Sequence, residues 1–305
     1  MIDVADFKYL YTISDEVIDG KPGKAFGYVR ELPTDEAAAI QAGQSLLRDM
    51  TEGHPLMDVF AAEAGFRAAV DALANATSKR ESLVPEVQRA FKYWLGSLRS
   101  FDDRTCAWIT RRLGKSHPAI GAFRAALRGE YDNNFAYRLS YVLRNKSEHV
   151  AAVINDLGFR AVVEPSEDVT TRPVIRIQGP KLVSQIPGLK AGVRDELRGA
   201  FRPIEVAQIV EAGSASCERS YMALVAELWD GHLEPAVSRC RSLHEEALEH
   251  DGDWAMFTDQ RYLVAGSRVE TQHNFFEMAE RLTDAYELTT MPAKPVVLTL
   301  QDFFG

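Results

Sequence analysis

The stretch Tyr137-Arg-Leu-Ser-Tyr-Val-Leu-Arg144-Asn145-Lys-Ser-Glu-His149 combines an amphipathic pattern with a group of polar side chains. At about 100° per residue, the apolar residues of this stretch and the apolar residues that flank it form one stripe that should face a core. The residues of this stripe are Phe135, Leu139, Val142, Leu143 and Val150. Arg138, Asn145 and His149 follow one edge of the stripe. The stretch therefore predicts a bundle helix with polar groups at the margin of its buried face.

Further segments have the apolar spacing or the capping residues of helices. These segments cover residues 34–51, 55–76, 82–112, 116–128, 189–201, 203–212, 216–229, 235–249 and 271–286. Ser116, ahead of His117-Pro118, is the expected N-cap of the fourth segment. Asp132 or Asn133 is expected to cap the helix that contains the stretch Tyr137–His149, which we call the motif helix. Gly213 is expected to separate two helices. Most of the chain is thus predicted to be helical.

Two β-hairpins are predicted from β-prone segments that flank turn residues. The first joins the segment that starts at Tyr9 to the one that starts at Phe26, and the second joins those that start at Phe159 and Val174. The fold class expected is mainly α. A helical bundle over residues 1–155 would carry the motif helix, and a mostly helical accessory region with a short hairpin would occupy residues 156–305.

Composition places the chain among ordinary globular proteins, with 305 residues, 46% apolar and 26% charged. No apolar run approaches the roughly 18–20 residues of a membrane span, and the start of the chain lacks the basic residues of a secretory signal. We therefore expect a cytoplasmic protein without a membrane partner. The three cysteines are widely spaced, without C-x-x-C, and are expected to be buried thiols.

No metal or cofactor is expected. His244 and His250 stand six residues apart, so they do not share a helix face as the two histidines of H-E-x-x-H do, and an acidic solvated helix explains them better. The sequence has no G-x-G-x-x-G, P-loop or G-x-S-x-G motif.

Charge is distributed unevenly along the chain. The net charge is −9, yet residues 104–146 contain nine Lys or Arg against only Glu130 and Asp132. That segment is +7, which leaves −16 on the rest of the chain. The overall charge argues against a protein that coats nucleic acid, whereas this segment is a candidate for RNA contact. The alternative is that the charged residues of this segment form a solvated helix face. The aromatic residues between them are more often part of a core than stacking platforms for bases.

The hexapeptide Arg144-Asn145-Lys-Ser-Glu-His149 resembles the R-N-x-x-x-H signature of the HEPN superfamily. These are helical-bundle ribonucleases of bacterial toxin–antitoxin, abortive-infection and CRISPR-associated systems. The resemblance covers the motif and, loosely, the helices from residue 35 to 150. An Arg stands five residues before a His four times in this chain, but only Arg144 is followed by Asn. Asn145 and the basic setting therefore carry the resemblance.

The resemblance implies metal-independent RNA cleavage through attack of the ribose 2′-hydroxyl on the adjacent phosphate. Arg144 would stabilise the phosphorane, His149 would position or protonate it, and Asn145 would orient neighbouring groups. The residues expected to bind the substrate are Arg138, Tyr141 and Lys146. The family's cleft commonly forms between two protomers, which suits the angle of about 140° between Arg144 and His149 on an ideal helix. A homodimer is therefore expected, with an antitoxin or regulatory protein as a further partner, in phage defence or growth control.

A non-catalytic helical interaction or scaffold protein is the alternative. In that reading the motif helix only packs, and Arg144 pairs with Glu148 at i,i+4. Non-catalytic members of HEPN-like bundles exist, so the fold alone would not establish activity.

Overall fold

The computed structural model shows a mainly helical chain with small antiparallel sheets, which confirms the predicted class. It describes residues 8–18, 21–76, 80–144, 153–163, 169–186, 188–250, 252, 254–258, 269–271, 273–290, 299 and 301. The chain divides into two compact units. Unit 1 comprises Met1–His54 and Val225–Pro292, and unit 2 comprises Pro55–Leu224 and Ala293–Gly305.

Unit 1 packs helices on a four-stranded antiparallel sheet of order β2-β1-β6-β7. Its elements are β1 (Tyr9–Ile18), β2 (Lys21–Glu31), α1 (Thr34–Met50), the π-helical turn η2 (Trp229–Leu233), α9 (Glu234–Glu249), β6 (Trp254–Thr258), β7 (Val269–Thr271) and α10 (His273–Thr290). The predicted first hairpin is confirmed. It is longer than expected, since β1 pairs with β2 from Tyr9 opposite Glu31 to Ile18 opposite Lys21. Leu10, Ile40 and Leu243 join sheet, α1 and α9 in one apolar cluster.

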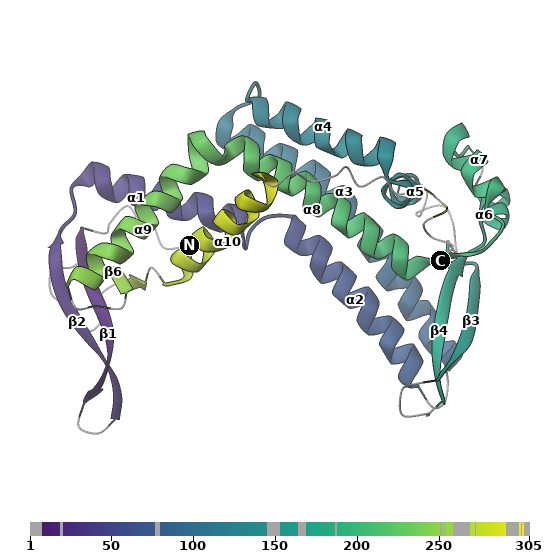
Figure 1. The fold of residues 1–305 in the computed structure, drawn as a ribbon, viewed down its shortest axis with the longest axis horizontal. Helices are drawn as coiled ribbons and strands as arrows, with labels where there is room; N and C mark the ends of the chain where they lie inside the picture. Colours follow the sequence, from purple (N-terminus) through teal and green to yellow (C-terminus); the bar gives the residue numbers. More distant parts are fainter. Residues whose placement is uncertain are drawn as a thin grey trace. The chain divides into compact units, whose positions relative to one another are not determined.

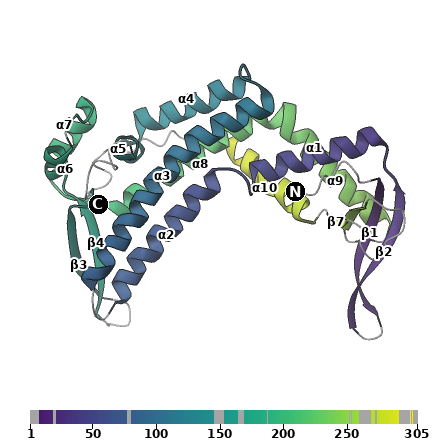
Figure 2. The ribbon, with the colours of Figure 1, turned by 180° about the vertical axis from the view of Figure 1, so that it is seen from behind.

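Unit 2 contains the motif helix. Its elements are α2 (Leu56–Asn75), α3 (Arg80–Leu113), α4 (Pro118–Asn133), α5 (Phe135–Arg144), β3 (Asp156–Val163), β4 (Val169–Ile177), α6 (Gly179–Gln185), α7 (Ala191–Gly199), β5 (Ile204–Glu205) and α8 (Val206–Leu228), whose last residues pass into unit 1. In Figures 1 and 2, α2 lies beside α3. The second predicted hairpin is confirmed as β3 and β4. Residues on both sides of position 155, where the domain boundary was expected, belong to unit 2, because β4 packs on α2.

Helix α8 corrects the expectation that Gly213 separates two helices. The helix runs without interruption through Gly213. A Cβ atom at this position would lie 2.8 Å from Cζ2 of Trp94 on α3. Trp94 is fully buried, and its Nε1 donates a hydrogen bond of 3.0 Å to Oγ of Ser214. The glycine is therefore needed for a close approach of α8 to the Trp94 ring.

Two helix starts also differ from the expected ones. His117, and not Ser116, caps α4, because its Nδ1 accepts a hydrogen bond of 3.2 Å from the backbone N–H of Ala119. Asn134, and not Asp132 or Asn133, caps α5. Its Oδ1 accepts hydrogen bonds from the backbone N–H groups of Ala136 and Tyr137, at 3.0 and 3.3 Å. Among the described helices, none has the length and hydropathy to cross a membrane.

Candidate functional site

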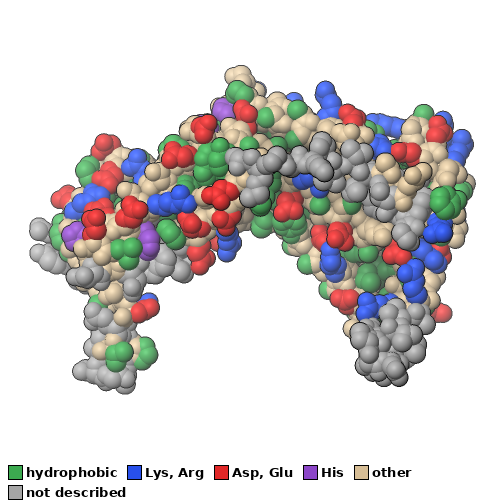
Figure 3. Space-filling model, viewed as in Figure 1, with side chains coloured by type: hydrophobic (Ala, Val, Ile, Leu, Met, Phe, Trp, Pro, Cys, Tyr) green, Lys and Arg blue, Asp and Glu red, His purple; other side chains and the backbone are tan. Residues whose placement is uncertain are grey.

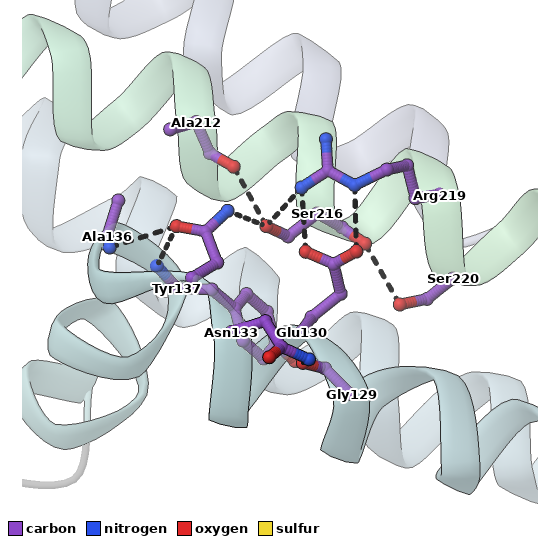
Figure 4. Close-up of polar contacts among 10 residues, drawn as sticks. Gly129, Glu130, Asn133, Ala136, Tyr137, Ala212, Ser216, Arg219 and Ser220 are labelled. Carbon is purple, nitrogen blue, oxygen red and sulfur yellow. Dashed lines mark hydrogen bonds and ion pairs between the residues drawn. The ribbon is translucent and has the colours of Figure 1, made fainter. Parts of the chain in front are cut away.

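A polar network fixes the start of α5 against α8 (Figure 4). The Nδ2 of Asn134 donates a hydrogen bond of 2.8 Å to Oγ of Ser216, which in turn donates to the carbonyl of Ala212 at 2.9 Å. Arg219 binds both carboxylate oxygens of Glu130 at 2.7 Å and also donates to Ser216 Oγ at 3.1 Å. Because Asn134 and Ser216 are buried, these bonds hold the α4–α5 junction in one orientation.

The apolar stripe predicted for the motif helix is buried where the structure describes it. Phe135, Leu139 and Leu143 are inaccessible to solvent, and Val142 is nearly so. Val150 lies outside the described residues. Burial of this face against α3 and α4 sets which side of α5 remains for polar contacts.

Arg144 is the last residue of α5, and its side chain is only 7% exposed. Its Nη1 donates to the carbonyl of Leu98 at 3.3 Å, and its Nη2 lies 3.5 Å from Oδ2 of Asp102. The guanidinium carbon lies 3.9 Å from the centre of the Tyr141 ring. A carboxylate, a carbonyl and an aromatic face therefore stabilise the cation.

Arg138 is engaged by other protein groups. Its Nη2 lies 2.6 Å from a carboxylate oxygen of Glu196 on α7, and its Nη1 donates to the carbonyls of Tyr131 and Asp132 at 2.8 and 3.1 Å. The side chain thus ties the end of α4 and the start of α5 to α7. The remaining predicted site residues, Asn145, Lys146 and His149, lie outside the described residues.

A cavity of about 460 Å³ opens beside Tyr141. Its lining comes from α3, α4, α5 and the residue that precedes α7. The lining residues are Asp102, Asp103, Arg124, Leu127, Arg128, Tyr131, Tyr137, Tyr141 and Lys190. Three cations therefore face two carboxylates around a partly aromatic surface. On the face shown in Figure 3, Lys and Arg side chains are frequent at the end of unit 2 where α5, α6 and α7 lie.

The tyrosines of the cavity differ in environment. Tyr131 and Tyr141 are half-buried and meet edge to face, with ring centres 5.3 Å apart. The Nζ of Lys190 lies 4.9 Å from the Tyr131 ring centre and 5.8 Å from that of Tyr141. Tyr137 is buried, and this burial raises the pKa of its hydroxyl far above the ordinary value, so the group stays neutral. Aromatic rings can stack on the flat ring of a base, and neighbouring cations can bind a phosphate group attached to it.

The described cysteines are free thiols, of which Cys217 and Cys240 are buried and Cys106 is half-buried. Burial raises the pKa of the Cys106 thiol, against the opposing effect of a hydrogen bond with Arg124. Burial also raises the pKa of Cys217. Both groups are therefore protonated at neutral pH and poor nucleophiles. Within the described ranges, no three His, Cys, Asp or Glu side chains gather closely enough to hold a metal ion.

Several residues of the cavity were not predicted as site residues from the sequence. Arg124, Arg128 and Tyr131 stand at i, i+4 and i+7, so they share one face of α4, and this spacing is visible in the sequence. Asp102 and Lys190 come from other elements, and no local pattern links them to that face. The structure thus places Tyr141 in the lining of the cavity and in contact with Arg144, which does not itself line the cavity, whereas Arg138 pairs with Glu196.

Comparison with known proteins finds no matching family model, no matching curated protein and no matching solved structure. The HEPN relationship therefore stays a prediction, based on the sequence of the motif.

Proposed function

We propose that the chain is a metal-independent endoribonuclease of HEPN type, with an HEPN-like bundle in its N-terminal half that carries the motif. The observation that supports this best is the set of contacts of Arg144: the first residue of the motif packs on the Tyr141 ring and contacts Asp102, and both of these residues line a cavity that also has three cations in its lining. RNA offers both a phosphate for such cations and bases for such rings.

In the proposed reaction the ribose 2′-hydroxyl releases its proton to water as its oxygen attacks the adjacent phosphorus, and the bond from phosphorus to the 5′-oxygen breaks. The products carry a 2′,3′-cyclic phosphate and a 5′-hydroxyl. Arg144 donates to a non-bridging oxygen as negative charge develops, and His149 gives its proton to the departing 5′-oxygen. Asn145 orients these groups. Because Arg144 contacts Asp102 at 3.5 Å, the phosphate competes with this carboxylate for the guanidinium.

The proposal includes a homodimer. Arg144 and His149 point about 140° apart on an ideal helix, so one helix does not easily bring both to the same phosphate. A second protomer would supply the missing group. A role in phage defence or growth control, with an antitoxin or regulatory protein that keeps the enzyme silent, belongs to the same proposal.

The test is RNA cleavage by the purified chain in EDTA. Wild type is expected to cleave, and Arg144→Ala and His149→Ala are each expected to lose about 100-fold or more in rate. Arg111→Ala is the control, because it removes an exposed cation of the same basic segment outside the cavity. Unchanged cleavage by both motif variants would refute the proposal.

A non-catalytic helical interaction protein is the second candidate, and the low exposure of Arg144 favours it. A guanidinium that is 7% exposed and contacts Leu98, Asp102 and Tyr141 is well suited to hold α5 against α3. This candidate predicts no RNA turnover by wild type. It also predicts that Arg144→Ala lowers the free energy of unfolding, which denaturant titration measures.

A further inference from the structure

We propose that the cavity between α3, α4, α5 and Lys190 is a pocket for one nucleotide, which holds a nucleobase with an exocyclic amino group and the phosphate attached to its ribose. The proposed function supplies RNA as one source of this nucleotide, but binding itself requires no cleavage. The volume of about 460 Å³ falls within the range of roughly 300–1,000 Å³ that small-molecule sites have.

The aromatic residues of the basic segment differ in their exposure to the cavity. Phe123 and Phe135 are fully buried and belong to the core. Tyr131 and Tyr141 are half-buried and line the cavity, where their rings meet at 81°. Tyr137 also lines the cavity but is buried, so Tyr131 and Tyr141 are the lining aromatic rings with exposed surface for a ligand. An accessible ring beside a cationic surface is a typical stacking platform for a base.

The cations of the pocket differ from the other cations of the same region. Arg138 and Arg144 have carboxylate partners in Glu196 and Asp102. In the part of the chain that the structure describes, neither Arg128 nor Lys190 is within ion-pair distance of a carboxylate. Both are exposed at the cavity. Their charges are therefore available to a phosphate, for which a guanidinium and an ammonium are suitable donors.

The carboxylates of the pocket come from α3, whereas the cations come from α4 and from the residue before α7. A phosphate is favoured near Arg128 and Lys190 and disfavoured near Asp102 and Asp103. Carboxylate oxygens accept hydrogen bonds from the amino groups of bases. Cytosine, adenine and guanine carry such an amino group, and uracil does not. We therefore expect CMP to bind more tightly than UMP.

The experiment is calorimetric titration of the full chain with CMP, UMP, cytidine and inorganic phosphate, in EDTA. CMP is expected to bind at least tenfold more tightly than UMP, cytidine or phosphate, since each lacks one of the two recognised groups. Lys190→Gln is expected to weaken CMP binding about tenfold and to leave cytidine binding unchanged. Asp103→Asn is expected to reduce the preference for CMP over UMP. Arg111→Gln is the matched control. Circular dichroism of this variant and of the others verifies that they are folded.

Equal binding of CMP and inorganic phosphate, or wild-type CMP affinity in Lys190→Gln, would overturn the pocket. A cytidine-containing oligoribonucleotide that displaces CMP identifies RNA as a source of the ligand, whereas CMP binding that such RNA does not displace identifies the free nucleotide. Specific CMP binding without RNA cleavage would leave the pocket intact and refute only the nuclease. Cleavage without CMP binding would refute only the pocket.

Discussion

Replacement of Gly213 by Ala tests the packing of α8 on α3. The new Cβ would lie 2.8 and 2.9 Å from Cζ2 and Cη2 of Trp94. The indole cannot easily retreat, because it is fully buried, bonded to Ser214 at 3.0 Å and stacked on Phe91. Alanine gains about 1 kcal/mol of helix propensity, whereas overpacking costs about 1–3 kcal/mol. We expect a net loss of about 0–2 kcal/mol in the free energy of unfolding.

The measurement is urea unfolding followed by circular dichroism at 222 nm, with Gly96→Ala as the control. Gly96 is an exposed helical glycine two positions from Trp94, and its added Cβ would meet nothing within 4 Å. This control should gain about 0.5–1 kcal/mol. If Gly213→Ala is stabilised as much as Gly96→Ala, the glycine does not serve the contact with Trp94.

Two further substitutions test the polar contacts. Asn134→Ala removes the acceptor for two backbone N–H groups and the hydrogen bond to Ser216. Denaturant titration should show that it lowers the free energy of unfolding by about 1–3 kcal/mol. A loss below about 0.5 kcal/mol would contradict the capping role of Asn134. Arg30 pairs with Glu36 and holds the pKa of this carboxyl group below its ordinary value of 4.5. The ionised carboxylate therefore stabilises unit 1 at pH values above 4.5, and this stabilisation is lost as the pH falls through the lower pKa of the folded state. Glu36→Gln should cost about 1 kcal/mol at pH 7 and flatten the acid limb of a stability-against-pH curve, whereas a curve parallel to that of wild type would exclude this role.

Local sequence patterns predicted most elements of the fold, because apolar period and turn residues act over a few positions. They could not predict that α8 continues through Gly213, since the reason is the Trp94 ring on α3. They also could not predict that β1 pairs with β6, or that α1 packs on α9. These contacts join distant parts of the chain, and they explain why unit 1 contains segments from both halves.

The site was only partly predictable for the same reason. The amphipathic pattern of α5 correctly placed its buried face, and Tyr141 does line a cavity. Arg138 was expected to bind substrate, but Glu196, which pairs with it, comes from α7. Lys190 reaches the tyrosines from the segment before α7. Neither contact has a local signature in the sequence.

The most direct test of the nuclease proposal is the mass of the RNA ends formed in EDTA. Wild type should produce fragments with a 2′,3′-cyclic phosphate and a matching 5′-hydroxyl, and His149→Ala should produce neither above background. Intact RNA after incubation with the wild-type chain, or the same fragments from His149→Ala, would contradict the proposal that this motif cleaves RNA.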